Sequence, residues 1–251
     1  MKILVTGATG LIGRSLCRTL TNDGHVVSAV SRSPGKSSGL AVAELHKWDT
    51  QAGSLPQAAL TGVDAVVNLA GEPIDARRWS DQQKRLIRDS RVVTTRNLVE
   101  ALRSVDRKPA VLVSSSAVGF YGDRGDQQLE ETSPAGRGFM SQVCAEWERE
   151  AGRATELGIR VVQVRTGVVL SAEGGALKKM LAVFKLGLGG PLGSGKQWFP
   201  WIHVEDIVGI FRHAILTATL AGPVNGVAPQ PVTNGEFTRE LGRALHRPAF
   251  L

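Results

Sequence analysis

A glycine-rich turn lies close to the N-terminus, between a short apolar run at residues 2–5 and a segment with helical periodicity at residues 11–22. Its sequence is Thr6-Gly7-Ala8-Thr9-Gly10-Leu11-Ile12-Gly13. Glycines at this spacing permit a tight turn, a close approach of the backbone to a pyrophosphate, and tight packing of a helix on a strand. The free amides at the start of the helix then attract phosphate. The turn predicts a dinucleotide site, and the alternative is a purely structural turn. The residues expected to contact the dinucleotide here are Gly7, Thr9, Gly10, Leu11, Ile12 and Gly13.

The end of the second apolar run indicates which dinucleotide is preferred. This run ends at Val30-Ser31-Arg32-Ser33, where sites selective for NAD commonly place an acidic residue on the ribose 2′-hydroxyl. No Asp or Glu stands there, and Arg32 can instead pair with a 2′-phosphate while Ser31 donates a hydrogen bond. We therefore expect NADP(H) as the cofactor; the alternative is that Arg32 is a solvated surface charge.

The formal net charge of +7 raises the question of a nucleic-acid partner. The basic residues are dispersed, however, and adjacent ones occur as isolated pairs such as Arg77-Arg78 and Lys178-Lys179. The few aromatic residues are not interleaved with them as a stacking platform requires. The sequence thus favours a small-molecule substrate over nucleic acid, and it does not indicate an oligomeric state.

The distribution of apolar residues and cysteines suggests a compartment. No stretch approaches the ~18–20 uncharged apolar residues of a membrane span, and the N-terminus lacks the pattern of a signal peptide. The two cysteines, Cys17 and Cys144, are too few for a disulfide framework. His, Cys, Asp and Glu residues nowhere show metal-ligand spacing. We expect a cytoplasmic protein without a membrane partner or a metal.

Short apolar runs alternate with amphipathic segments through the first two-thirds of the chain, which predicts a doubly wound α/β fold with a parallel sheet. After about residue 166 glycines and prolines predict a loop-rich stretch, followed by a last strand between two helices. The expected organisation is a Rossmann domain over residues 1–166 and a mixed segment over 167–251 that forms a small substrate lobe and returns one strand and helix to the sheet. The expected strands are Lys2–Val5, His25–Val30, Asp64–Leu69, Ala110–Ser114, Arg160–Val164 and Pro223–Val227, and the expected helices are Leu11–Asn22, Ser80–Ser104, Phe139–Thr155, Val204–Leu216 and Asn234–Leu245.

Several motifs along the chain resemble those of the extended short-chain dehydrogenase/reductases, and more closely their epimerase-family branch. The resemblance implies an NAD(P)-binding Rossmann fold, in which Leu69, Ala70, Gly71 and Val168 also contact the cofactor. Members of this branch continue beyond the residue that corresponds to Leu251, so the resemblance implies a C-terminally truncated lobe. The motifs are the N-terminal glycine turn, Asn68–Pro73, Arg78-Trp79, Ser90-Arg91, Ser114–Ala117, Trp147-Glu148, Arg165–Leu170, Leu186–Trp198, Trp201–Asp206 and Asn225–Pro229.

The chain departs from this family at the catalytic residues. The family uses Asn, Ser, Tyr and Lys, with Tyr and Lys one helical turn apart so that the ammonium shifts the pKa of the phenol. Ser116 matches the Ser that orients a carbonyl, but the Tyr and Lys positions correspond to Met140 and Cys144. The Asn position corresponds to Arg91, which either contacts the cofactor as the missing Lys would or is a surface charge.

The remaining candidate acid is Tyr121, the only tyrosine of the chain. It stands near Ser116 in sequence, but no cation can be identified beside it, and an aromatic that lines the pocket is the alternative. Cys144 is expected to be a small buried hydrophobe rather than a nucleophile. His203 is expected to form a structural hydrogen bond that links the two lobes.

The function that follows is an NADP(H)-dependent oxidoreductase of unknown substrate without the usual Tyr–Lys pair. The first alternative is a catalytically silent NADP(H)-binding sensor that affects cell division, as the family label suggests. The second is a nucleotide-sugar epimerase, which would need an efficient base that the sequence lacks.

Overall fold

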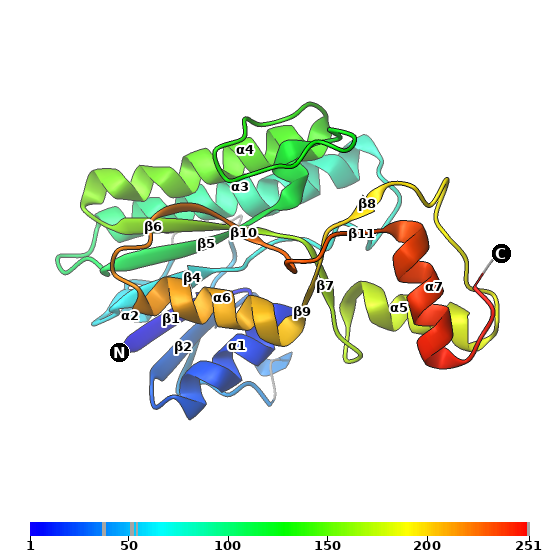
Figure 1. The fold of residues 1–251 in the computed structure, drawn as a ribbon. Coiled ribbons are helices and arrows are strands. Elements are labelled where there is room, and N and C mark those ends of the chain that lie inside the picture. Colours follow the sequence, from blue (N-terminus) through cyan, green and yellow to red (C-terminus); the bar gives the residue numbers. More distant parts are fainter. Residues whose placement is uncertain (37–38, 51–52, 54, 250–251) are drawn as a thin grey trace.

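The computed structural model describes residues 1–36, 39–50, 53 and 55–249, and these form a seven-stranded parallel sheet flanked by helices on both faces (Figure 1). The strand order is β10-β6-β5-β4-β1-β2-β3, so the doubly wound fold expected from the sequence is confirmed. The central strands are buried on both faces, and their sequences are accordingly continuous apolar runs. The strands are β1 Lys2–Thr6, β2 Val26–Ser31, β3 Glu44–Lys47, β4 Ala65–Asn68, β5 Val111–Ala117, β6 Arg160–Thr166 and β10 Gly222–Gly226.

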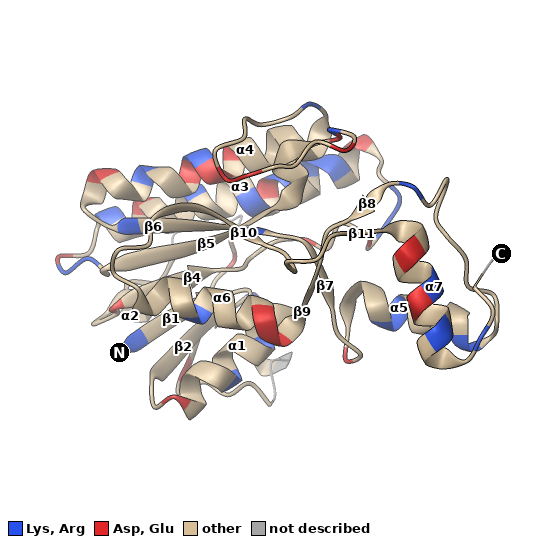
Figure 2. Cartoon of the chain, in the orientation of Figure 1, with Lys and Arg blue, Asp and Glu red and all other residues tan. Residues whose placement is uncertain are grey.

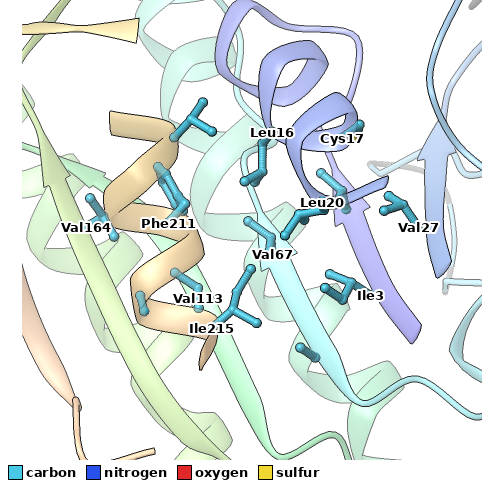
Figure 3. Close-up of a cluster of buried hydrophobic side chains, with 14 of the residues drawn as sticks. Ile3, Leu16, Cys17, Leu20, Val27, Val67, Val113, Val164, Phe211 and Ile215 are labelled. Carbon is cyan, nitrogen blue, oxygen red and sulfur yellow. The ribbon is translucent and has the colours of Figure 1, made fainter. Parts of the chain in front are cut away.

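Helices α1 (Leu11–Asn22) and α6 (Val204–Leu216) cover one face of this sheet. Figure 3 shows Leu16 and Leu20 of α1 and Phe211 and Ile215 of α6 directed at the strands between them. All four side chains are at most 3% exposed. Burial of apolar surface of this kind, at about 25 cal/mol per Å², holds both helices on the sheet. A helix from the C-terminal part of the chain therefore completes the core of the N-terminal part.

Helices α3 (Asp81–Arg103) and α4 (Phe139–Gly152) lie side by side on the opposite face. Ser80 caps the start of α3 by accepting from the Gln83 amide. Ion pairs join the two helices, among them Arg96–Glu150 at 2.7 Å. Figure 2 shows basic and acidic residues alternating along both helices, which is the pattern of paired surface charges rather than of a basic patch.

A smaller layer lies beyond the carboxyl ends of the strands (Figure 1). It contains β7 (Val168–Leu170), α5 (Gly175–Lys185), β8 (Trp198–Phe199), β9 (Trp201–His203), β11 (Val232–Thr233) and α7 (Asn234–Leu245). Three segments of the chain, at Gly167, Pro200 and Gly226, lie in contact where this layer joins the sheet. Val168 N donates to Pro200 O at 2.7 Å and Gly167 N donates to Gly226 O at 3.0 Å. The division at residue 166 stays a prediction.

Several elements differ from the sequence expectation: the short helix α2 (Gln57–Leu60) and the short strands β7, β8, β9 and β11 were not expected, and neither were α5 and β3. The stretch after residue 170 was expected to be loops because of its glycines, but it contains helix α5, whose sequence Gly175–Lys185 is amphipathic. Its glycines stand at the helix ends, with Gly174 as the N-cap and Gly187 just beyond the C-terminus. Strand β3 was missed because it is an edge strand, in which none of the residues Glu44–Lys47 is fully buried and no apolar run exists. Among the described residues, no helix has the length and apolar character needed to cross a bilayer.

Candidate functional site

A cavity of about 800 Å³ opens at the carboxyl ends of β1, β2 and β4. In parallel sheets this is the edge at which loops form ligand sites. The cavity brings together three segments that the sequence analysis selected separately, namely the glycine turn, the end of β2 and the end of β4. Its lining consists of Thr6, Gly7, Thr9, Gly10, Val30, Ser31, Arg32, Ser33, Trp48, Asp49, Thr50, Leu69, Ala70, Gly71, Glu72, Pro73, Arg77, Gln83, Leu86 and Ser90.

The three glycines of the turn serve different purposes. A Cβ at Gly7, whose φ is +65°, would lie 2.5 Å from the carbonyl oxygen of Leu69. A Cβ at Gly13 would lie 2.4 Å from the carbonyl oxygen of Gly7. Gly10 is different, because its Cβ would meet only Gly7 O, at 3.3 Å, and would otherwise enter open space. Gly7 and Gly13 are thus required by backbone packing, whereas Gly10 keeps the backbone open toward a ligand.

The first turn of α1 is available to an anion. Its N-cap is Gly10, which has no side chain to cap the helix, and no acidic residue stands in the first turn. Leu11 and Ile12 contribute backbone amides here, while their side chains pack elsewhere: Leu11 against Gly174 and Gly175, and Ile12 against the core. Free amides at a helix N-terminus favour phosphate.

Hydroxyl and amide side chains fix the opposite wall of the cavity. Thr6 Oγ1 donates to Asn68 Oδ1 at 2.8 Å and accepts from the amides of Leu69 and Ala70 at 3.2 Å. Asn68 Nδ2 in turn donates to Thr95 Oγ1 at 2.8 Å. This buried network joins the ends of β1 and β4 to α3, so the wall is held rigidly.

Arg32 is exposed at the rim of the cavity and forms no ion pair within the described part of the chain. Ser31 stands beside it, and its Oγ accepts from the Ser33 amide. An exposed guanidinium without a carboxylate partner is available to a ligand phosphate. Trp48, Asp49 and Thr50 also line this wall. The sequence does not indicate them, because they follow β3, a strand without an apolar run.

Arg91 is a half-buried cation next to the cavity wall. Its guanidinium carbon lies 3.2 Å from where a Cβ on Gly71 would stand and 5.5 Å from the Trp147 ring centroid. Nη1 donates to Ile87 O at 2.9 Å, and no carboxylate of the described residues lies within ion-pair distance. Burial lowers the pKa of Arg91. A half-buried guanidinium with no carboxylate at ion-pair distance among the described residues is a candidate for binding an anionic or hydroxyl-bearing ligand.

Ser116 and Tyr121 meet in a second, buried cluster. Ser116 Oγ donates to Glu148 Oε1 at 2.6 Å, and Arg165 donates to both oxygens of Glu148 at 2.9 Å. Arg165 Nη1 also donates to the Tyr121 hydroxyl at 2.9 Å, and this hydroxyl donates to Asn225 Oδ1 at 2.6 Å. Burial lowers the pKa of Arg165, but its hydrogen bonds to Glu148 and Tyr121 raise it overall.

This cluster corrects the expectation that Tyr121 has no neighbouring cation, because Arg165 provides one. Tyr121 is only 3% exposed, however, and neither it nor Ser116 belongs to the wall of the cavity among the described residues. The sequence could have indicated the pairing only through strand register, since Ser116 lies opposite Arg165 in neighbouring strands.

Other candidates of the sequence analysis occupy plain structural positions. Burial raises the pKa of Cys144 to about 11, so this thiol is protonated and unreactive at neutral pH. Val168 pairs with Trp201 between β7 and β9, outside the cavity wall. His203 does not link the lobes as expected: its Nδ1 accepts from the Glu205 amide and caps α6. No group of His, Cys, Asp and Glu among the described residues has the geometry of a metal site.

Comparison with known proteins identifies the family. Residues 3–225 match the NAD dependent epimerase/dehydratase family. The chain is 45% identical over 247 residues to an epimerase family protein of Mycobacterium bovis, covering 98% of this chain and 79% of the relative.

Two solved structures are also similar. Human epimerase family protein SDR39U1 (isoform 2), crystallised with NADPH, superposes with a TM-score of 0.88 at 40% identity, covering 100% of this chain and 82% of the human one. A nucleoside-diphosphate sugar epimerase from Corynebacterium glutamicum gives a TM-score of 0.82 at 36% identity, covering 100% of this chain and 52% of that chain. The chain belongs to the NAD dependent epimerase/dehydratase family.

Proposed function

We propose that this protein is an NADP(H)-dependent oxidoreductase that acts on a small molecule without the Tyr–Lys pair of its relatives. One observation carries the proposal: a cavity that joins the open glycine turn at Gly10 to Arg32, a cation that has no ion pair with any residue the structure describes. The NADPH in the similar human structure supports the choice of cofactor.

The side chains around the cavity suit this cofactor. The first-turn amides of α1 hold the pyrophosphate, and the rigid wall Leu69-Ala70-Gly71 limits where the dinucleotide lies. Arg32 and Ser31 bind the 2′-phosphate. Arg91 supplies a fixed cation beside Gly71, in place of the Lys that corresponds to Cys144. The bound cofactor supplies or accepts the hydride.

The proton must come from a group other than a Tyr–Lys pair. Ser116 is positioned by Glu148, and Glu148 is itself held by two hydrogen bonds from Arg165. With its proton donated to Glu148, Ser116 Oγ can accept from the hydroxyl of an alcohol substrate or product, whereas donation to a carbonyl would require Ser116 to turn away from Glu148. Tyr121 is the candidate for terminal acid; Arg165 donates to both Tyr121 and Glu148 and so holds Tyr121 and Ser116 in one cluster, without itself relaying a proton.

Titration of NADPH and NADH by cofactor fluorescence, followed by NADPH oxidation with a panel of carbonyl compounds, tests the proposal. We expect NADPH to bind at least about tenfold more tightly than NADH, because one charge-assisted contact contributes about 1.5–3 kcal/mol. Consumption of NADPH by one carbonyl class supports the oxidoreductase. Failure of the parent protein to bind NADPH would refute it.

A second candidate function is a cofactor-binding sensor without turnover. In the same experiments such a protein would bind NADPH tightly but would not oxidise it with any carbonyl compound. The observation that favours it is the pair Met140 and Cys144 at the Tyr and Lys positions, together with a Tyr121 hydroxyl already engaged on both sides. Nucleotide-sugar epimerisation stays the third candidate, and interconversion of a UDP-sugar would be its result.

A further inference from the structure

Apolar side chains are exposed beside the candidate site, on the segment that joins β4 to α3 and on the first turns of α3. Ile74 is 43% exposed, Trp79 41% and Leu86 37%. Exposed large apolar side chains are common singly, but a cluster next to a cavity marks a binding surface. The same segment provides part of the cavity wall, through Pro73, Arg77 and Leu86 itself.

The aromatic part of this surface is fixed in position. Trp79 Nε1 donates to the carbonyl oxygen of Ile74 at 2.7 Å. Its ring meets Phe139 edge to face, with centroids 5.5 Å apart. A Trp held by a hydrogen bond and by a second aromatic loses little conformational entropy when a ligand packs on it. This surface is therefore preorganised for an apolar ligand.

A second apolar surface stands next to the first. Lys179 of α5 pairs with Asp75 at 2.6 Å, which brings α5 against the segment that contains Ile74. Val183 and Leu186 follow Lys179 at intervals of four and three residues, so they share its side of the helix. They are 46% and 74% exposed. An ion pair thus joins two apolar surfaces at this edge of the molecule.

These surfaces reach the position where catalytic chemistry is expected. Phe139 begins α4, and the next residue, Met140, occupies the place of the family Tyr. Met140 is half-buried, and its Cβ lies 3.4 Å from where a Cβ on Gly119 would stand, on the short helix that follows Ser116. A phenol is replaced here by an apolar side chain. Apolar side chains therefore extend from Trp79 through Phe139 to Met140, which lies against Gly119 in the short helix after Ser116.

We propose that Ile74, Trp79 and Phe139, with Val183 of α5 and Leu186 at its C-terminal cap on the neighbouring surface, bind the apolar body of an alcohol or carbonyl substrate. The proposal rests on the proposed oxidoreductase function and names its substrate class. A sugar hydroxyl needs hydrogen-bond donors and acceptors, whereas these five side chains offer hydrophobic area. The substrate class is thus an aliphatic or aromatic compound rather than a nucleotide sugar.

The test measures binding of decanol by calorimetry and, with decanal, the KM and kcat of NADPH oxidation. Trp79→Ala is compared with Leu216→Ala, which shortens an equally exposed residue at the far end of α6 (44% exposed). We expect decanol to bind the parent protein. Trp79→Ala should weaken decanol binding and raise the KM for decanal, each about tenfold, whereas Leu216→Ala should change neither decanol binding nor this KM. NADPH affinity should be equal in all three proteins, which also shows that the variants are folded.

The outcomes separate this proposal from the proposed function. If the parent does not bind NADPH, the oxidoreductase function fails; if it binds NADPH but not decanol, only the substrate class fails. Equal decanol binding by Trp79→Ala and the parent would overturn the assignment of the site. Three other results would also overturn it. UDP-glucuronate could compete with decanol for the site, which would indicate a nucleotide sugar. The parent could form a dimer that Trp79→Ala dissociates, or co-sediment with phosphatidylcholine vesicles in a way that Trp79→Ala abolishes, which would indicate a second copy of the chain or a lipid surface.

Discussion

Two valine substitutions in the glycine turn should separate ligand binding from folding. Gly10→Val adds a side chain whose Cβ meets only Gly7 O, at 3.3 Å, and whose methyl groups enter the cavity. Gly13→Val places a Cβ 2.4 Å from Gly7 O and 2.7 Å from the Cα of Ala8. Both variants carry the same added volume, three residues apart in one turn.

The expected costs follow from these distances. At Gly10 the main loss of stability is a poor N-cap, about 1 kcal/mol, which lowers the Tm by ~2–4 °C in a chain of this size. At Gly13 the backbone must move, and overpacking costs about 3 kcal/mol or more, which lowers the Tm by at least ~6 °C. Loss of two charge-assisted contacts to the pyrophosphate in Gly10→Val, at about 1.5–3 kcal/mol each, weakens NADPH binding at least about a hundredfold.

Thermal melts by circular dichroism and NADPH titration by fluorescence measure the two effects. We expect Gly10→Val to be folded and unable to bind NADPH, and Gly13→Val to be strongly destabilised. The reasoning is wrong if Gly10→Val binds NADPH within threefold of the parent. It is also wrong if the two variants lose the same stability, because the glycines would then share one structural purpose.

Four further substitutions or measurements test other parts of the site. Arg32→Asp should weaken NADPH binding at least about tenfold and leave NADH nearly unchanged, since one charge-assisted contact is lost; unchanged NADPH affinity would make Arg32 a bystander. Tyr121→Phe should lower turnover about a hundredfold at constant NADPH affinity, the scale of a lost general acid, and full activity would remove Tyr121 from catalysis. The pKa of Cys144 is about 11, against an ordinary 9.0, so less of it is thiolate in the native protein. At pH 8 it should therefore react with iodoacetamide about a hundredfold more slowly in the native than in the unfolded protein. Equal rates would show that the thiol is exposed. Glu150→Gln should destabilise the protein at pH 7 by about 1.5–3 kcal/mol. Hydrogen bonds from Arg96 lower the pKa of Glu150, so its contribution is present above the unfolded pKa and is lost as the pH falls through the folded pKa. A stability loss that stays constant as the pH is lowered until the parent unfolds would contradict this.

The cofactor side of the site could be predicted because its information is local. The glycine turn and Arg32 each lie within a few residues of a strand end, and a strand–helix alternation fixes where such ends lie. Helices such as Leu11–Asn22 were also predictable, since their apolar residues repeat with helical period. The strand Glu44–Lys47 was not, because an edge strand without an apolar face carries no such pattern.

The cluster around Ser116 could not be predicted, for a different reason. Arg165 reaches Tyr121 across 44 positions of sequence, through the register that pairs Ser116 with Arg165. Strands buried on both faces have no alternating pattern, and the sequence therefore does not specify their register. The resemblance to a family located Ser116 but gave no means of seeing which charges surround it.

The contacts among three chain segments at Gly167 have a consequence for how the loop-rich layer could be exchanged between proteins of this fold. Gly167, Pro200 and Gly226 lie in contact, so the excursion between residues 167 and 200 leaves and rejoins the sheet at one place. A segment with adjacent ends can be lengthened, shortened or exchanged while the strands beneath it keep their pairing. We expect that residues 167–200 of one protein could be grafted onto the cofactor-binding sheet of another, provided that these backbone contacts are kept.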